Sequence, residues 1–270
     1  MSKRPGVIKL SVNVNKIAWL RNARAGDRPD VVAVAQTIID AGAQGITVHP
    51  RPDQRHITAR DTRQLAALIT NNPQVEYNIE GNPSSRARKG RKTRKTRKNG
   101  YPGFAALIEE CRPTQATLVP DSDSQLTSDH GFDLLHTDNM RLKRQVRRCQ
   151  AAGARVSLFM DPEPEQIKAA RDCGVERIEL YTGPYAEAFL QHGEHGQATQ
   201  REFARHVAAA EQAATLGLGI NAGHDLDQAN LVLFKELPGL AEVSIGHALV
   251  ADALEAGLAT TVAAYLQALV

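Results

Sequence analysis

The sequence predicts an α/β protein built as one (β/α)8 TIM barrel, and three observations support this. Eight short aliphatic segments of strand length alternate with segments whose apolar residues recur at helical spacing. Strict alternation predicts a parallel sheet with right-handed crossovers. In a chain of 270 residues, eight such units favour a single closed barrel domain over an open doubly wound sheet. The absence of a G-x-G-x-x-G motif after the first strand also counts against a dinucleotide-binding fold.

The eight predicted strands are short aliphatic segments, most of which end in polar, proline or glycine residues. They cover residues 8–14, 45–49, 75–79, 115–119, 155–160, 177–181, 218–221 and 241–245. Short runs rich in Val, Ile and Leu are typical of strands that are buried on both faces of a parallel sheet.

The predicted helices lie between these strands, where apolar side chains repeat every three to four residues. They cover residues 17–24, 31–41, 61–70, 103–110, 140–152, 163–173, 200–216, 226–236 and 251–269. Helix-ending residues support several of these bounds. Gly42 and Gly174 stand just after two of the helices, and Pro238 follows a third.

The composition is that of an ordinary globular protein. Hydrophobic residues make up 42% and charged residues 23%, but aromatic residues only 4%, so we expect an aliphatic core. The three cysteines, Cys111, Cys149 and Cys173, are odd in number and form no C-x-x-C motif, which indicates a reducing compartment rather than a disulfide framework or zinc ribbon. Without a signal-like N-terminus or a run of about 18 apolar residues, we expect a cytoplasmic protein with no membrane span.

The basic charge of the chain is concentrated in residues 86–98, RARKGRKTRKTRK. This segment holds nine of the 33 Lys and Arg residues, so the formal net charge of +3 comes from it and the remainder is mildly acidic. A like-charge run this dense is typical of a disordered, solvated surface insertion, which we expect at residues 84–99. The alternative is an electrostatic contact with nucleic acid. Because the segment has no interleaved aromatic residues for base stacking, we expect no nucleic-acid partner.

Ionisable and amide side chains follow most of the predicted strands. They are Asn13 and Asn15 after the first strand, His49 and Arg51 after the second, Glu80 after the third, Thr127, Ser128 and His130 after the fourth, Glu179 at the sixth, His224 after the seventh and His247 after the eighth. In a barrel the carboxyl ends of all strands share one face, which carries the active site. Any one of these side chains could be a hydrogen-bonded core residue. Three His and two Glu at the same end of separate strands instead indicate catalysis.

Imidazoles and carboxylates that converge in one enclosed site can shift one another's pKa toward neutrality and move several protons in turn. These side chains also suit zinc or iron, but no H-x-H or H-E-x-x-H spacing occurs, so we expect no metal. A Schiff-base aldolase would need a lysine at a strand end. Lys16 is the candidate, although a charged loop lysine is usually only solvated.

Small residues after the seventh and eighth strands favour a phosphate site. Residues 222–225 (AGHD) and 245–247 (IGH) occupy positions where backbone N–H groups and a helix N-terminus commonly hold phosphate in barrels. Arg24 and Arg51 would supply charge to one or two phosphates. For each glycine alone, a simple turn is the alternative.

Eight motifs, in order along the chain, resemble those of the pyridoxine 5'-phosphate synthase family. They are LSVNVNKIAWLRNAR, GITVHPRPDQRHI, VEYNIEGNP, LVPDSDSQLTSDHG, RVSLF, RIELYTGPYA, GINAGHDL and VSIGHAL. The resemblance covers nearly the whole chain apart from roughly residues 84–99. It implies a (β/α)8 barrel that condenses 3-amino-2-oxopropyl phosphate with 1-deoxy-D-xylulose 5-phosphate, without a metal or organic cofactor. It also implies a lid at residues 120–131 and a homo-oligomer of up to eight subunits.

The resemblance further implies roles for individual residues. His49 and Glu80 match proton-accepting residues, His224 matches a proton donor, and Glu179 matches a carboxylate that stabilises a transition state. The positions that match the aminoketone phosphate site are Asn13, Arg24, Asp225, Gly246 and His247. The positions that match the deoxyxylulose phosphate site are Asn15, Lys16, Arg51, His56 and Thr127.

The sequence departs from a common form of this family at two places. Asn15-Lys16 stands where many members have Asp-His, so a carboxylate is lost and a titrating group is replaced by a fixed cation. Direct proton transfer by residue 16 is therefore in doubt, while binding of a phosphate or carbonyl oxygen is retained. Asp225 stands where some members have Gly, so we expect it to contact substrate through its backbone.

Two alternatives to the synthase remain open. A nucleic-acid-binding or scaffold protein that has lost turnover is favoured only by Asn15-Lys16 and the basic segment, whereas His49, Glu80, Glu179 and His224 would be unnecessary in such a protein. A phosphate-sugar isomerase or aldolase on the same barrel is not excluded by fold. It would turn over one phosphorylated substrate alone.

Overall fold

The computed structural model describes residues 7–24, 26–90, 100–122 and 125–270. Within them eight strands form one closed barrel. The strands are β1 (Lys9–Asn13), β2 (Gly45–Val48), β3 (Glu76–Gly81), β4 (Gln115–Leu118), β5 (Arg155–Met160), β6 (Arg177–Tyr181), β7 (Gly219–Gly223) and β8 (Leu240–Ile245). Each strand pairs in parallel with the next in sequence, and β8 pairs with β1. The (β/α)8 barrel predicted from alternation is thereby confirmed.

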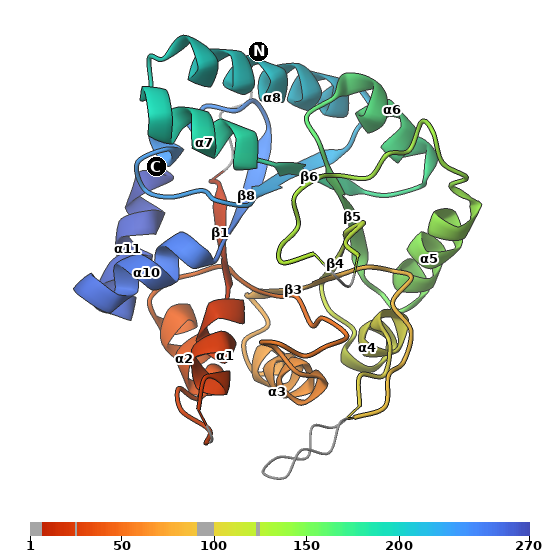
Figure 1. Cartoon of the computed structure of the whole chain (residues 1–270), viewed down its shortest axis with the longest axis vertical. Coiled ribbons are helices and arrows are strands. Elements are labelled where there is room, and N and C mark those ends of the chain that lie inside the picture. The colour runs from red at the N-terminus through yellow and green to blue at the C-terminus, as the bar shows by residue number, and fades with distance from the viewer. Residues whose placement is uncertain (1–6, 25, 91–99, 123–124) are drawn as a thin grey trace.

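Helices surround the barrel, as Figure 1 shows with the strands at the centre of the view. The helices are α1 (Asn15–Asn22), α2 (Val31–Asp40), α3 (Ala59–Thr70), α4 (Phe104–Cys111), α5 (Met140–Ala151), α6 (Pro164–Asp172), α7 (Gly183–His192), α8 (Gln197–Thr215), α9 (Leu231–Phe234), α10 (His247–Ala256) and α11 (Leu258–Ala268). The main hydrophobic core consists mainly of aliphatic side chains, with a few aromatic ones.

One helix of the structure was not predicted, and two predicted helices differ from the structure. Helix α7 was not predicted, although the proline of Gly183-Pro184 lies in its first turn, where proline is tolerated. The predicted helix 226–236 is only the short α9, because the preceding residues form a local turn in which Asp227 and Asn230 bond each other's backbone N–H. The predicted helix 251–269 is two helices, α10 and α11. Gly257 separates them with φ +83° and ψ 146°, a conformation open essentially to glycine alone.

The side chains inside the barrel are largely polar. Ser11 Oγ lies 2.7 Å from Thr47 Oγ1, and Thr117 Oγ1 donates to Asn78 Oδ1 over 3.0 Å. At the amino end of the barrel, Glu76 accepts from both Lys9 and Arg155. Barrels of this class are usually filled by branched aliphatic side chains. Here a hydrogen-bonded network fills the space below the site.

An isolated β-bridge joins residues on either side of residues 91–99 of the predicted basic insertion. Arg88 and Tyr101 exchange two backbone hydrogen bonds, of 2.7 and 2.9 Å, as an isolated antiparallel bridge. The residues predicted to be a solvated insertion lie mostly at 91–99, outside the described residues.

Two further features bear on the predictions from composition. The thiols of Cys111, Cys149 and Cys173 are all free, and burial raises the pKa of Cys111 to about 11 and that of Cys149 to about 12. In the described part of the chain, no helix is long and apolar enough to cross a membrane.

Candidate active site

A cavity of about 390 Å³ opens at the carboxyl ends of the strands. The predicted site residues that line it are Asn13, Asn15, Lys16, His49, Arg51, His56, Glu80, Thr127, Glu179, His224, Asp225, Gly246 and His247. Arg24 does not line it. That residue is exposed beyond the end of α1. The barrel therefore brings together residues that are more than 230 positions apart in sequence, such as Asn13 and His247.

Two asparagines join the first strand to the second at the cavity. Asn13 Oδ1 accepts from the backbone N–H of Asn15 over 3.0 Å, and Asn15 Oδ1 accepts from the backbone N–H of His49 over 3.0 Å. Asn13 Nδ2 lies 3.5 Å from Glu80 Oε2. The amide oxygen of Asn15 thus makes a contact that a carboxylate oxygen could also make, so the Asn at this position fits its surroundings.

Lys16 lies on the first turn of α1, where it faces an aromatic ring. Its Nζ lies 4.8 Å from the centroid of the Trp19 ring, within range of a cation–π interaction. The same indole ring lies 6.4 Å from the imidazole of His56. Trp19 therefore connects two of the predicted binding residues at the edge of the cavity.

The two histidines after β2 are buried in a cationic setting. Burial is the main cause that lowers the pKa of His49 well below its usual 6.5, and the nearby charge of Arg51 lowers it further. Burial and the neighbouring Arg51 and Arg55 also lower the pKa of His56, to about 3. His56 Nδ1 accepts from the backbone N–H of Ile57 over 2.9 Å. At neutral pH both rings are therefore uncharged, and His49 can accept a proton.

Two glutamates line the same cavity from β3 and β6. Burial and the neighbouring Glu179 raise the pKa of Glu80 well above its usual range. Burial and Glu242 likewise raise the pKa of Glu179. Glu179 Oε2 is buried and has no hydrogen-bond partner among the described residues. Glu80 lies within β3 rather than after it, so strand register aims its side chain into the barrel.

Glycine at two strand ends keeps the floor of the cavity open. A Cβ added to Gly223 would lie 2.4 Å from Glu179 Oε1, so a side chain there would displace the carboxylate. Gly246 precedes α10, whose first residues His247 and Ala248 line the cavity. The N-terminus of α10 therefore faces the cavity with its unpaired backbone N–H groups.

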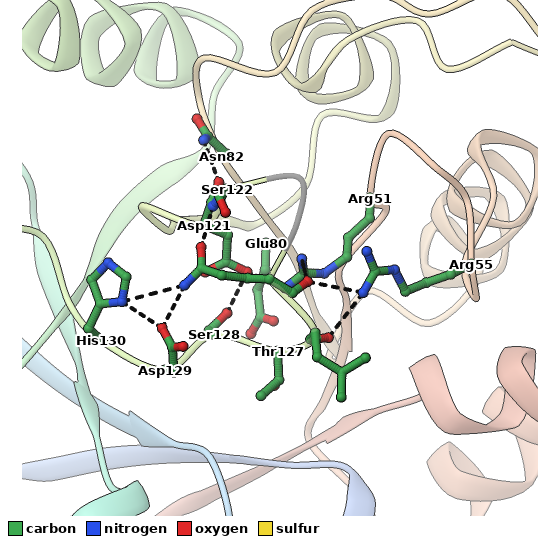
Figure 2. Close-up of polar contacts among 12 residues, drawn as sticks. Arg51, Arg55, Glu80, Asn82, Asp121, Ser122, Thr127, Ser128, Asp129 and His130 are labelled. Carbon is green, nitrogen blue, oxygen red and sulfur yellow. Dashed lines mark hydrogen bonds and ion pairs between the residues drawn. The ribbon is translucent and has the colours of Figure 1, made fainter.

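The loop between β4 and α5 covers the cavity and is anchored to the loop after β2. Arg51 forms an ion pair with Asp121, to which Ser128 Oγ also donates over 2.8 Å. Arg51 and Arg55 each donate to the carbonyl oxygen of Gln125 over 3.0 Å, as Figure 2 shows. The arginine that was predicted to bind phosphate is therefore also tied to the covering loop.

His224 has a partner on each ring nitrogen. Its Nδ1 lies 2.8 Å from Asp225 Oδ2, and its Nε2 lies 2.9 Å from Thr127 Oγ1 in the covering loop. Its ring packs edge-on against Tyr181, with centroids 5.2 Å apart. The side chain of Asp225 thus contacts its neighbouring imidazole, while the expected backbone contact of Asp225 with substrate stays a prediction.

Several residues of the cavity were not identified from sequence. Trp19 stands three residues after Lys16 on α1, and this spacing could have placed the two on one face. Phe159 lies one residue before the end of β5 in alternation with Arg155 and Ser157, so strand register could have identified it. Asp121, which pairs with the cavity residue Arg51 without lining the cavity itself, carries no sequence signal beyond its place in a polar loop.

The described ranges contain no group of three or more His, Cys, Asp or Glu side chains placed to hold a metal ion. Each of the ionisable groups in the cavity instead contacts other protein groups or faces the cavity itself.

A closed parallel barrel with a cavity lined by ionisable side chains at its strand carboxyl ends defines the chain as a (β/α)8-barrel enzyme. The model of the family described as "Pyridoxal phosphate biosynthesis protein PdxJ" matches residues 10–270. The chain belongs to this family, whose members are enzymes of pyridoxine biosynthesis, the pathway to vitamin B6.

Relatives named pyridoxine 5'-phosphate synthase cover almost the entire chain. One from Xanthomonas oryzae pv. oryzae (strain MAFF 311018) is 52% identical over 263 residues, which is 97% of this chain and 96% of the relative. One from Xanthomonas campestris pv. campestris (strain B100) is 54% identical, over 95% and 94% of the two chains. One from Xylella fastidiosa (strain M23) is 50% identical, over 97% and 94%.

Similar solved structures have low sequence identity and show the fold alone. Thiamine phosphate pyrophosphorylase from Pyrococcus furiosus has a TM-score of 0.58 at 7% identity, over 97% of this chain and 95% of that chain. Phosphoribosyl anthranilate isomerase from Thermus thermophilus has a TM-score of 0.51 at 12% identity, over 97% and 98%.

Proposed function

We propose that the chain condenses 3-amino-2-oxopropyl phosphate with 1-deoxy-D-xylulose 5-phosphate to give pyridoxine 5'-phosphate, inorganic phosphate and water. The observation that carries this proposal is the convergence of His49, Glu80, Glu179 and His224 in one cavity. A pyridine ring made from an amine and two carbonyl compounds requires imine formation, enolisation, phosphate elimination, ring closure and dehydration. Each step moves a proton, so several acid/base groups around one cavity are needed.

The pKa directions support distinct roles for these side chains. His49 is neutral at physiological pH and accepts protons from carbon or nitrogen. Glu80 holds a proton more tightly than an ordinary carboxyl and can return the one that it accepts. His224 donates a proton to a leaving oxygen. Glu179 has one unpartnered oxygen, and because its pKa is raised to about 8 it would have to release its proton before it stabilises positive charge that develops during ring formation.

Phosphate binding has support at two edges of the cavity. The N-terminus of α10, with Gly246 and His247, suits the phosphate of the aminoketone. Lys16, Arg51 and His56 lie together at the other edge and suit the deoxyxylulose phosphate. Arg51 pairs with Asp121, so a phosphate that binds to Arg51 would exchange with that carboxylate. The covering loop would then reorganise over both substrates and exclude water from the imine and enol intermediates.

The test is a coupled assay of absorbance and phosphate release, with both substrates together and with each alone, and without added metal. Pyridoxine phosphate and inorganic phosphate should appear in equal amounts only when both substrates are present. Turnover of either substrate alone would support the isomerase or aldolase alternative. No turnover by the folded protein with both substrates would refute the proposal.

We also propose that the enzyme is a cytoplasmic homo-oligomer, with the octamer as the expected state. The family resemblance suggests the oligomer, and three free cysteines suit a reducing compartment. Light scattering of the purified full chain would give the mass directly. A mass of one 29.3 kDa chain would contradict this part of the proposal.

A further inference from the structure

Three side chains from two loops form a continuous row at the edge of the cavity. Asp225 Oδ2 lies 2.8 Å from His224 Nδ1, and His224 Nε2 lies 2.9 Å from Thr127 Oγ1. A carboxylate can only accept a hydrogen bond, so His224 Nδ1 must donate to it. In the neutral imidazole Nε2 then carries the lone pair, and the Thr127 hydroxyl donates to it. The contacts therefore define one tautomer of His224.

The backbone at this point takes an unusual conformation that brings the two side chains together. His224 has φ +90° and Asp225 has φ +57°, the region that favours glycine. The segment is held there by its neighbours. Thr182 Oγ1 donates to the carbonyl oxygens of Gly223 and His224, and Asn230 Nδ2 donates to that of Asp225 over 3.0 Å. An aspartate at a position suited to glycine indicates that its side chain has a use.

We propose that Asp225 is a positioning residue for His224. Its carboxylate holds the imidazole with the proton on Nδ1 and with Nε2 directed at the cavity, and it stabilises the ring when Nε2 also carries a proton. This inference rests on the proposed function, in which His224 donates a proton. In that step the Nε2–H bond breaks, a substrate O–H bond forms, and the Nδ1 proton stays in its hydrogen bond to Asp225.

The surroundings of the carboxylate set the size of the expected effect. The side chain of Asp225 is 55% exposed and that of His224 is 19% exposed, so solvent weakens their ion pair. The His224 hydrogen bond, with Lys16 and His247 nearby, lowers the pKa of Asp225 and keeps it ionised. Loss of a hydrogen bond to a charged group should lower kcat by about ten- to a hundredfold, less than the loss of a fully buried partner.

The test uses ¹⁵N NMR of histidine-labelled full-length enzyme without substrate, because ring nitrogen shifts distinguish the two tautomers. His224→Gln identifies the resonances of His224 among the nine histidines. In the wild type the neutral ring should carry its proton on Nδ1. In Asp225→Asn and Asp225→Gly the ring should become a mixture of tautomers. An unchanged Nδ1–H tautomer in both variants would overturn the proposal, whether or not the wild type makes pyridoxine phosphate.

Kinetics of the same variants separate positioning from a structural role. Asp225→Gly relieves the backbone at φ +57°, so its Tm should be equal to or higher than that of the wild type while kcat falls and KM changes little. Asp225→Glu, which retains the carboxylate, should recover part of kcat. Asp227→Asn is the matched control in the same loop, and it should keep the wild-type tautomer and kcat. Wild-type kcat in Asp225→Gly, or an equal loss in Asp227→Asn, would overturn the proposal and leave the proposed function intact.

Discussion

His49 and His56 come from the same loop and both are buried, but their ring nitrogens have different partners. His56 Nδ1 is occupied by the backbone N–H of Ile57, so this ring can offer only its other nitrogen. The ring nitrogens of His49 bond none of the described residues, and the ring lines the cavity. A free, neutral imidazole beside the substrates is suited to accept a proton.

His49→Asn should therefore fold normally and lose most of its activity. General acid–base catalysis contributes about 10² to 10⁴ in rate, so we expect kcat to fall by at least about a hundredfold in the coupled assay. Circular dichroism would confirm the fold. His136→Asn, a change at an exposed histidine away from the cavity, is the control and should retain full activity. Wild-type kcat in His49→Asn would rule out the acid/base assignment.

Most cavity residues could be predicted because they stand where a strand ends, and strand ends are visible in the sequence. His49, Glu80, Glu179 and His224 were found in this way. Arg24 does not line the cavity because α1 ends at Asn22 and leaves it exposed, and its role in phosphate binding stays a prediction. The contact between Asp225 and His224 depends on two positive φ angles, and sequence patterns do not reveal these at non-glycine residues.

At the scale of elements, the covering loop is tied down by arginines from a different loop. Arg55 donates to the carbonyl oxygens of Gln125 and Leu126 over 3.0 and 3.2 Å (Figure 2). It also pairs with Asp53. Because it reaches the loop through the main chain, its effect does not depend on the side chains that the loop carries.

Arg55→Ala should loosen this loop and weaken substrate binding. We expect KM for the deoxyxylulose phosphate to rise about tenfold with a smaller change in kcat, since hydrogen bonds to a charged group are lost. Steady-state kinetics would measure this. Arg63→Ala removes a surface ion pair with Glu110 far from the cavity and should leave KM unchanged. An unchanged KM in Arg55→Ala would show that the loop is held without this residue.

Helices α10 and α11 meet at a residue whose conformation only glycine adopts easily. Gly257→Ala should lower the free energy of unfolding by about 1–3 kcal/mol because φ is +83° and ψ is 146°. Urea denaturation would measure the change. Thr260→Ala, at an exposed position of α11, should change it by less than about 0.5 kcal/mol. Equal midpoints for Gly257→Ala and the wild type would mean that the junction adapts without strain.

Helices and strands could be predicted where the residues at their own ends mark their bounds. The strands β5 and β6 have the predicted bounds because apolar runs and flanking polar residues mark both ends. The break at Gly257 was missed because the apolar pattern continues across it into α11. Helix α7 was not predicted, although the proline of Gly183-Pro184 fits a first helical turn.

At the scale of the whole molecule, the polar interior could not be predicted from strand patterns. In β1 the polar residues Lys9, Ser11 and Asn13 alternate with Leu10 and Val12. Such alternation normally indicates one solvated face. Barrel closure instead turns this face inward, where the residues bond one another. The fold class was predictable from alternation along the chain, whereas the filling of the barrel depends on contacts between strands.

This interior makes stability depend on pH through Glu242. Burial is the main cause that raises the pKa of Glu242 from its ordinary 4.5 to about 7, and the nearby charge of Glu76 raises it further. Between these values the folded protein retains a proton that the unfolded chain releases, so stability falls as pH rises through about 7. Glu242→Gln should be more stable than the wild type by on the order of 2 kcal/mol at pH 8, and the difference should shrink toward pH 5.

Urea denaturation at the two pH values would test this prediction. The amide of Gln can keep the contact that Glu242 Oε1 makes with Asn221 Nδ2 at 3.3 Å. Glu211→Gln, at an exposed position of α8, should show no such pH-dependent difference. A constant difference between Glu242→Gln and the wild type at both pH values would contradict the assigned titration.

Trp19 is the only tryptophan of the chain, and it lies at the edge of the cavity between Lys16 and His56. The intrinsic fluorescence of the enzyme therefore originates at the place where substrates are expected to enter. A phosphate that draws Lys16 away from the indole would change that emission without any label. Affinities could thus be measured for one substrate at a time, and in inactive variants such as His49→Asn, where no product forms.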